Sequence, residues 1–263
     1  TLQGIHLRIG KFLMRQNRFT EAVTYLQRAV RLHSLTYSPT HTPTHSPTPQ
    51  VREYPENKKR IEPISYLAKA LVAQGHIKAA IHQYERLLVL SPESVSSHSE
   101  LAWALLRFES YSRAESRFHV ALRIDPHDTN SLRGLAYTLM TQHQGNDDDT
   151  STRQRIIKAF ETLLQHDPRD AQSYVYLSRI IKDRAKKLEY LRRAIQMRPN
   201  WAFVHHELAQ NLFEGGDTKL AIEHFQEAVR NERANMTNQY IFLPQQTPRL
   251  SFLRFRESLG KAY

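Results

Sequence analysis

Residues 63–92, PISYLAKALVAQGHIKAAIHQYERLLVLSP, and residues 97–126, SHSELAWALLRFESYSRAESRFHVALRIDP, follow one pattern twice. The closing residues, Pro92 and Pro126, are 34 residues apart. Large apolar residues recur at the helical spacing that makes one buried face, and small residues recur where two helices have to cross closely. Each proline stands where the second helix has to stop. The stretch therefore predicts a helical hairpin that repeats along the chain.

The same offsets extend over most of the sequence and predict six units. These are residues 3–33, 61–94, 95–128, 129–170, 171–201 and 202–235. The fourth unit is longer than the others, because a polar, acidic insertion at 145–152 stands where its two helices turn. The fifth is shortened at the same turn, near Asp183. Irregular turns of this kind are typical of surfaces fitted to a partner.

This pattern resembles the tetratricopeptide repeat. The resemblance rests on the large–small pair Leu101 and Ala102 in the first helix and, in the second, on Ala114, Phe118 and Ala121 before the closing proline. It implies an all-α fold, a right-handed superhelical solenoid of about six helix-turn-helix repeats. One such repeat cannot bury its own apolar face, so its neighbours have to stack on it.

Two segments lie outside the repeats. Residues 34–60 are rich in Ser, Thr, Pro and His and predict a disordered linker or loop. Residues 236–263 form a C-terminal tail with an apolar stripe at helical spacing, for which we expect a capping helix over the last repeat. The alternative is a partner-docking tail. Its contact residues would be Phe252, Phe255, Arg254 and Arg256.

The resemblance also implies a binding surface. In this family the first helix of each repeat lines a concave face, chiefly through its second, fifth, ninth, twelfth and thirteenth positions. Here the middle of that face is basic and aromatic, with few carboxylates, and its candidate partner-binding residues are Lys69, Trp103, Arg107, Arg133, Tyr137, Arg179 and Lys182. Aromatic faces pack apolar anchors, and guanidinium groups bind carboxylate or phosphate bidentately. An acidic peptide or a nucleic-acid strand would suit this surface; the alternative is that the cations only solvate a groove.

One subtype of the family can be tested by residue identity. Its members grip the C-terminal carboxylate of heat-shock chaperones with Lys, Asn and Arg at set positions. The third repeat of this chain has Ser96 and Glu100 where two cations belong. No register of the six units restores the clamp, so we do not expect a chaperone-tail adaptor.

No motif indicates catalysis. The chain has no cysteine, which excludes a disulfide scaffold, Cys-ligated zinc and a cysteine nucleophile. The eight glycines form no phosphate-binding loop. His205, His206 and Glu207 lack the spacing of a zinc-binding helix, and we expect them on the exposed side of a repeat helix. We therefore predict a protein that is not an enzyme and has no metal site and no cofactor.

Charge bears on the partner rather than on the fold. Lys and Arg number 37 and Asp and Glu 26, which gives a net charge of +11 and favours an acidic partner. No stretch approaches the roughly 18 consecutive apolar residues that a membrane span needs. Residue 1 is Thr, so we expect a processed or partial chain.

These observations predict an interaction protein. We expect a scaffold or adaptor subunit that binds proteins of a larger assembly, with a ribonucleoprotein such as a mitochondrial ribosome as the favoured setting. We expect an intracellular location, the mitochondrial matrix rather than the cytosol. One alternative is a helical-repeat protein that contacts RNA phosphates through its basic groove. Another is a peptide receptor for trafficking or import.

Overall fold

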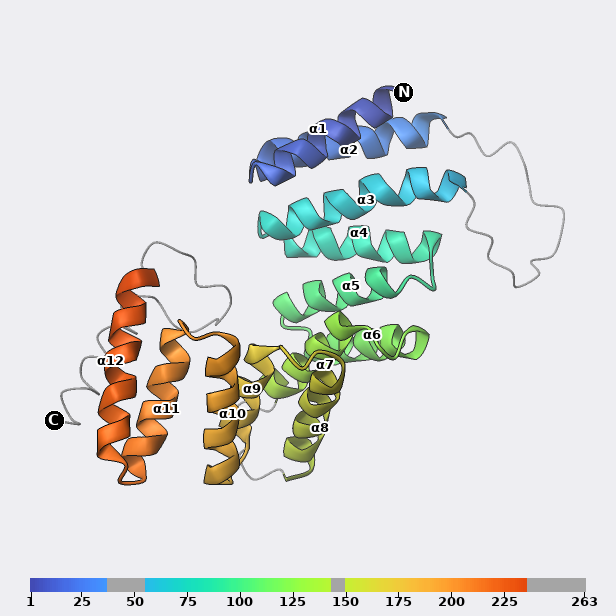
Figure 1. Cartoon of the computed structure of the whole chain (residues 1–263). Helices are drawn as coiled ribbons and strands as arrows, with labels where there is room; N and C mark the ends of the chain where they lie inside the picture. The colour runs from blue at the N-terminus through green and yellow to red at the C-terminus, as the bar shows by residue number, and fades with distance from the viewer. Residues whose placement is uncertain (37–54, 143–149, 236–263) are drawn as a thin grey trace. The chain divides into compact units, whose positions relative to one another are not determined.

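A computed structural model describes residues 1–36, 55–142 and 150–235, and this part of the chain is helical throughout apart from short turns (Figure 1). The helices form two compact units. The first unit contains α1 (Leu2–Arg15), α2 (Phe19–Thr36), α3 (Pro55–Ala73), α4 (Ile77–Leu90), α5 (Val95–Arg107), α6 (Tyr111–Ile124) and α7 (Thr129–Gln142). The second contains α8 (Thr150–His166), α9 (Ala171–Ile180), α10 (Arg184–Met197), α11 (Ala202–Glu214) and α12 (Thr218–Asn235). The all-α repeat fold predicted from the sequence is confirmed.

Successive helices pair as hairpins, and each hairpin packs on the next within its unit. The hairpins are α1–α2, α3–α4 and α5–α6 in the first unit and α9–α10 and α11–α12 in the second. The two helices expected for the fourth repeat belong to different units, since α7 is in the first and α8 in the second.

Two helices begin inside segments that the sequence suggested were irregular. Helix α3 starts at Pro55, within the expected linker 34–60, and α8 starts at Thr150, within the expected insertion 145–152. Proline suits a first helical turn, because the N–H it lacks has no partner there in any case. Residues 37–54, 143–149 and 236–263 lie outside the described residues, and with them the predicted capping helix and the tail residues Phe252, Arg254, Phe255 and Arg256.

The turn within a hairpin has a common geometry. The fifteenth residue of four repeats has a left-handed backbone: Asn17 (φ 57°), Gly75 (φ 82°), Glu109 (φ 59°) and Gly216 (φ 88°). In each case the next residue donates its N–H to the carbonyl five residues before it, at 2.9 or 3.0 Å. This arrangement ends a helix by satisfying carbonyls that have no partner within it. It also sets where the second helix can begin.

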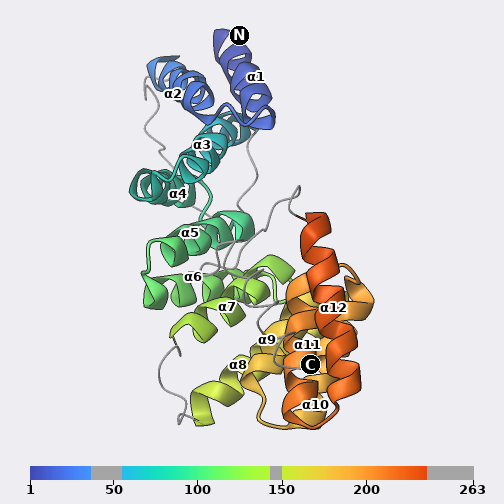
Figure 2. The same ribbon diagram turned by 90° about the vertical axis from the view of Figure 1, so that its left-hand side faces the viewer.

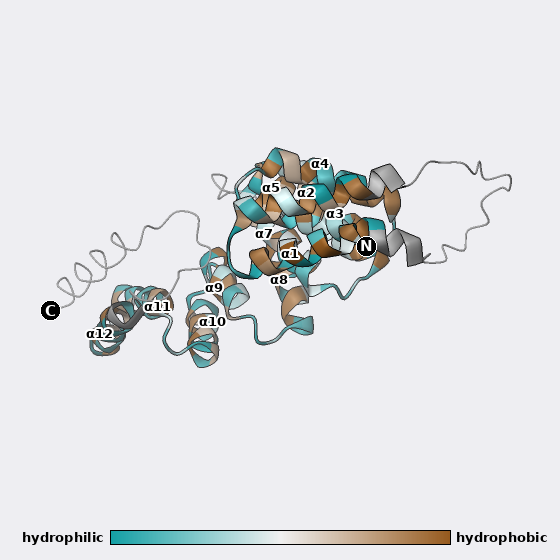
Figure 3. Cartoon of the chain, turned by 90° about the horizontal axis from the view of Figure 1, so that it is seen from above, coloured by the Kyte–Doolittle hydropathy of each residue, from teal (hydrophilic) through white to brown (hydrophobic). Residues whose placement is uncertain are grey.

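Each unit has its own apolar core between the helices. In the first unit Leu26, Tyr84, Leu101, Leu105 and Phe118 are almost completely shielded from water. The corresponding residues of the second unit include Phe160, Leu177, Leu191 and Phe225. Colouring by hydropathy shows both apolar and polar residues along the helices, as expected for amphipathic segments that bury one side (Figure 3).

None of the helices within 1–36, 55–142 and 150–235 is both long and apolar enough to cross a bilayer.

Candidate functional site

The candidate binding residues lie on the first helices of consecutive hairpins. In the first unit Lys69 is on α3, Trp103 and Arg107 are on α5, and Arg133 and Tyr137 are on α7. Figure 2 shows α3, α5 and α7 one after another along this unit, and α5 and α7 contact each other directly. The repeat thus brings residues that are about one unit apart in sequence onto neighbouring helices.

An aromatic pair bridges α5 and α7. The ring centroids of Trp103 and Tyr137 are 6.3 Å apart, with the ring planes inclined by 35°. Trp103 also meets the buried ring of Phe118 edge-on, at 5.7 Å and 82°. Aromatic side chains favour such edge-on contacts. Trp103 therefore rests on the core of the unit while part of its side chain remains accessible.

The accessible surface of the Trp103–Tyr137 pair is mainly apolar, as the state of its polar atoms indicates. The indole Nε1 of Trp103 is buried and has no hydrogen-bond acceptor within the described part of the chain. Burial, followed by the influence of Tyr111, raises the pKa of Tyr137 above its ordinary value of 10.0, so its phenol is neutral at pH 7. An incoming group would meet the accessible face of an aromatic ring rather than the indole N–H.

A hydrogen bond also joins α5 and α7 and shows their relative direction. Asn130 Nδ2 donates to Ser99 Oγ over 2.7 Å. Ser99 precedes Trp103 by four residues, and Asn130 precedes Tyr137 by seven. Since both contacts join the two helices and occur in the same order along each, α5 and α7 run in the same direction.

Two arginines flank the aromatic pair. Arg107 follows Trp103 by four residues on α5, and Arg133 precedes Tyr137 by four residues on α7. Four residues of helix advance about 6 Å. Because the two helices are parallel, Arg107 follows the rings along the helix direction and Arg133 precedes them. Arg107 is exposed and Arg133 is half-buried.

The candidate lysine of α3 is already paired. Lys69 Nζ lies 3.1 Å from Glu100 Oε1, and Tyr84 donates its hydroxyl proton to the other oxygen of Glu100 over 3.2 Å. Burial, and then the charge of Glu100, raises the pKa of Tyr84 well above its ordinary value. Lys11 of α1 also forms an ion pair with a glutamate of the next first helix, Glu62 of α3. The expectation of few carboxylates near the basic positions is therefore wrong for α3 and α5.

The second unit repeats this arrangement. Arg179 of α9 lies 3.5 Å from Glu207 of α11, and its guanidinium carbon is 4.7 Å from the ring centroid of Phe203. Arg179 and Glu207 occupy the ninth and sixth positions of successive repeats, as Lys69 and Glu100 do. Lys182 is exposed, just beyond the end of α9. The sequence analysis did not identify this pairing of a ninth position with the sixth position of the next repeat, although an alignment of the repeats would show both charges.

The prediction that His205 lies on the exposed side of its helix is wrong. Its ring is buried, with Nε2 2.8 Å from the carbonyl oxygen of Pro199 and Nδ1 3.1 Å from His224 Nδ1. A carbonyl only accepts, so His205 Nε2 carries a proton, and a neutral His205 accepts the Nδ1 proton of His224. Burial, and then His205, lowers the pKa of His224.

The contact with the proline carbonyl recurs. His98 Nε2 lies 2.8 Å from the carbonyl oxygen of Pro92, and the hydroxyl of Tyr174 donates to that of Pro168 over 3.3 Å. Each donor stands six residues after its proline, at the fourth position of a first helix. These side chains tie the start of a helix to the turn before it, which is a structural role. In the described residues no group of three or more His, Asp or Glu side chains is placed to hold a metal ion.

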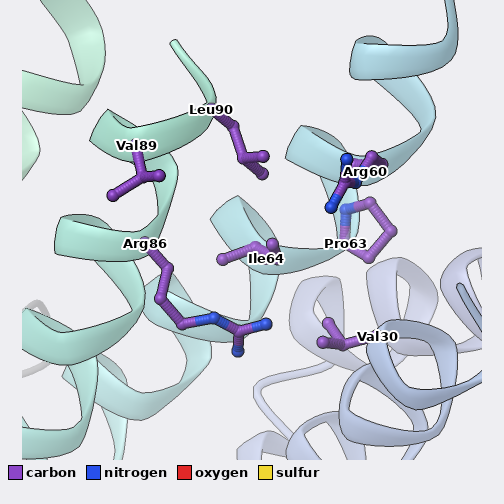
Figure 4. Close-up of a pocket in the computed structure, with 7 residues that line it drawn as sticks. All are labelled: Val30, Arg60, Pro63, Ile64, Arg86, Val89 and Leu90. Atoms are coloured by element: carbon purple, nitrogen blue, oxygen red, sulfur yellow. The ribbon is translucent and has the colours of Figure 1, made fainter. Parts of the chain in front are cut away.

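A separate cavity of about 220 Å³ lies among α2, α3 and α4 (Figure 4). Its lining consists of Val30, Arg60, Pro63, Ile64, Arg86, Val89 and Leu90. None of the candidate residues is among them, so this cavity is not the predicted groove. Its small volume would admit a side chain rather than an extended segment.

The hairpin repeats and the basic, aromatic face of their first helices define the chain as an all-α helical-repeat protein. Models of the tetratricopeptide repeat match residues 7–42 and 67–129. The chain therefore contains tetratricopeptide repeats, a fold that supports interactions between proteins. No curated protein sequence matches it.

Solved structures share the fold at low sequence identity. A MamA fragment from Desulfovibrio magneticus RS-1 is 18% identical, with a TM-score of 0.58, over 68% of this chain and 97% of that chain. A chain of the APC/C hetero-tetramer Cut9–Hcn1 is 14% identical, with a TM-score of 0.63, over 99% of this chain and 42% of that one. YrrB, described as a TPR protein with an unusual peptide-binding site, is 15% identical, with a TM-score of 0.53, over 69% of this chain and 91% of its own.

Proposed function

We propose that this chain is a non-catalytic adaptor subunit of a larger assembly and that it binds an extended segment of a partner protein across α5 and α7. The observation that carries the proposal is the Trp103–Tyr137 pair with an arginine toward each side. An apolar side chain of the partner would pack on the rings. Carboxylates before and after it would pair with Arg107 and Arg133.

Electrostatics favour protein over RNA as the ligand of this surface. Lys11, Lys69 and Arg179, which stand at the same position of three repeats, each pair with a glutamate of the next first helix. A groove that follows a phosphate backbone requires a row of cations that are not neutralised by the protein itself. RNA binding is the second candidate, supported by the net charge of +11 and by the aromatic pair as a stacking platform. Its signature is steep salt dependence.

The surroundings of the complex belong to the same proposal. The charge of +11 favours an assembly that contains nucleic acid, such as a mitochondrial ribosome, and with it the mitochondrial matrix. The adaptor would contact a protein of that assembly. A receptor for trafficking or import is the remaining alternative, and it predicts a short linear ligand whose binding tolerates salt.

The test is affinity purification of the tagged chain from its native cells, with and without nuclease, followed by mass spectrometry. The informative variant is Arg107→Glu, because this side chain is exposed and its replacement leaves the core intact. The matched control is Arg123→Glu, which makes the same change in charge at an exposed position of α6, a second helix.

We expect a fixed set of protein partners that survives nuclease, is lost with Arg107→Glu and is kept with Arg123→Glu. Loss of the partners after nuclease treatment would show that RNA holds the complex together, and RNA binding would then be the favoured function of this surface. Equal recovery of nuclease-resistant partners by both variants would show that the partner binds elsewhere and would refute the proposed site.

A further inference from the structure

Basic residues are concentrated on α10 of the second unit. This helix contains five basic residues and one acidic residue, and Lys182 and Arg198 flank it. Helix α12 of the same unit contains three residues of each kind. Among the helices of 1–36, 55–142 and 150–235, α10 has the largest excess of positive charge. The charge of α10 is therefore a local feature of this helix and not an even share of the chain's net charge.

Three of these cations make contacts inside the second unit. Arg184 donates to a main-chain carbonyl of α11 over 3.1 Å. Arg193 lies 2.7 Å from Glu189, and the guanidinium carbon of Arg198 is 4.6 Å from the ring centroid of Trp201. The positions of these three side chains are explained by the protein itself.

The other exposed cations have no carboxylate partner among the residues that the structure describes. These are Lys182, Lys186 and Arg192. Lys186 and Arg192 are six residues apart, which is about 9 Å along the helix, and Lys182 lies just before α10. Glu189 stands between them in sequence and is paired with Arg193. A nucleic-acid duplex carries one negative charge per about 1.7 Å of its axis, so a row of this length would meet several phosphates.

The cations of α10 do not serve the stability of the helix. The first turn of a helix favours Asp and Glu, because the N-terminal end carries a partial positive charge. Beyond the N-cap Asp183, the first turn of α10 has no acidic residue and instead contains Arg184, Lys186 and Lys187. A sequence that departs from a local rule in this way is expected where it serves a function.

The exposed side of α10 lacks the anchors of a protein interface. Such an interface is built around apolar or aromatic side chains in its core. Met197, the last residue of the helix, is the one large apolar side chain among the exposed residues of α10. Contacts to a phosphate backbone, in contrast, are made mostly by Lys and Arg. The surface thus suits nucleic acid better than protein, unlike the aromatic pair of α5 and α7.

The aromatic content of α10 favours a duplex over a single strand. Proteins that bind single strands stack the bases on accessible aromatic rings. The aromatic residue of α10, Tyr190, is half-buried, and its ring centroid lies 6.0 Å from that of Tyr174. Helix α10 therefore offers charge without a stacking platform, which fits a double helix whose bases are already paired.

We propose that the exposed side of α10 binds the phosphate backbone of a double-helical nucleic acid, through Lys182, Lys186 and Arg192 and without regard to base sequence. The surface lies in the second unit, whereas the Trp103–Tyr137 pair lies in the first. It does not depend on the function proposed for that pair, because a protein segment at α5 and α7 and a duplex at α10 contact different helices.

The experiment measures binding to the whole chain by fluorescence anisotropy at salt concentrations from about 50 to 200 mM. The probes are an RNA duplex and a DNA duplex of about 20 base pairs, a single-stranded oligouridine of the same length, and polyglutamate. The test variant combines Lys186→Gln with Arg192→Gln. The matched control combines Lys219→Gln with Arg230→Gln, which removes the same charge from exposed positions of α12. Circular dichroism checks that each variant keeps its helix content.

We expect the two duplexes to bind alike, with an affinity that falls steeply as salt rises. Each phosphate contact contributes about 0.9 to the slope of log K against log salt, so the test variant should reduce the slope by about 2. The control variant should keep the slope of the parent.

Equal slopes for the two double variants would overturn the proposal. So would a preference of more than about tenfold for one of the duplexes, because contacts to the backbone alone carry no such preference. Tighter binding of oligouridine than of the duplexes would assign the surface to a single strand. Binding of polyglutamate as tight as that of the duplexes would assign it to an acidic protein, and either result would refute the proposed ligand.

Discussion

Replacing Gly134 by alanine adds one methyl group where α7 passes closest to α6. A Cβ atom at this position would lie 2.1 Å from Cζ and 2.2 Å from Cε1 of Phe118. The Phe118 ring is fully buried and packs edge-on against Trp103, so it has no open space to move into. The two helices would have to separate, or the ring would have to leave its rotamer.

Two effects of opposite sign give the expected magnitude. Overpacking of a core costs about 1–3 kcal/mol. Alanine favours the helix over glycine by about 1 kcal/mol, which offsets part of that cost. A contact of 2.1 Å is far inside van der Waals distance, so the upper part of this range, about 2–3 kcal/mol, applies. After the offset we expect Gly134→Ala to lower the free energy of unfolding of the first unit by about 1–2 kcal/mol. The emission of Trp103 should shift as well, because its support moves.

The assay is urea unfolding followed by circular dichroism and by fluorescence. A Trp201→Phe background leaves Trp103 as the sole tryptophan, since the chain has two. Gly4→Ala in α1 is the control, because a Cβ there would meet only Thr1 Oγ1, at 3.4 Å. Its stability should stay equal or rise slightly. A Gly134→Ala protein as stable as its parent would refute the close approach of α7 to Phe118.

Two further predictions concern buried polar groups. Burial and His205 lower the pKa of His224 below 6.5, so the unfolded chain takes up the proton first. The stability of the second unit should be full above pH 6.5 and fall below it, and His224→Gln should flatten this dependence in melting curves recorded at several pH values. Lys69→Met removes a half-exposed ion pair and should cost less than about 1 kcal/mol. Glu100→Leu also leaves the hydroxyl of Tyr84 without its acceptor and should cost about 1–3 kcal/mol. A lower urea midpoint for Lys69→Met than for Glu100→Leu would contradict this account.

The repeat geometry could be predicted because it depends on the spacing of residues within one repeat. Leu101, Ala114 and Phe118 recur at fixed offsets, and a helix with such a period has one apolar face whatever its neighbours are. Gly75 and Gly216 stand at the turn where the backbone is left-handed, although Asn17 and Glu109 take the same conformation without glycine. The turn was therefore visible in two repeats and hidden in the other two.

The candidate surface was harder to predict because it depends on pairs of helices. The sequence indicated aromatic and basic residues on the first helices, but not that Trp103 and Tyr137 approach within 6.3 Å between their ring centroids. It also did not reveal that Lys69 forms an ion pair with Glu100. Such pairs join residues on neighbouring helices, and their distances depend on how far one helix slides along the other.

The sequence by itself determined the helical repeat, the turns marked by Gly75 and Gly216 and the resemblance to the tetratricopeptide repeat, because periodicity and turn chemistry act within a few residues of the chain. Only the tertiary structure decided that His205 is buried against a proline carbonyl and that the ring of Trp103 lies beside that of Tyr137. The physical reason is the same in each case. A helix has a polar side and an apolar side by its own composition, but burial of a given residue requires a second surface, and that surface comes from a distant part of the chain or from a partner.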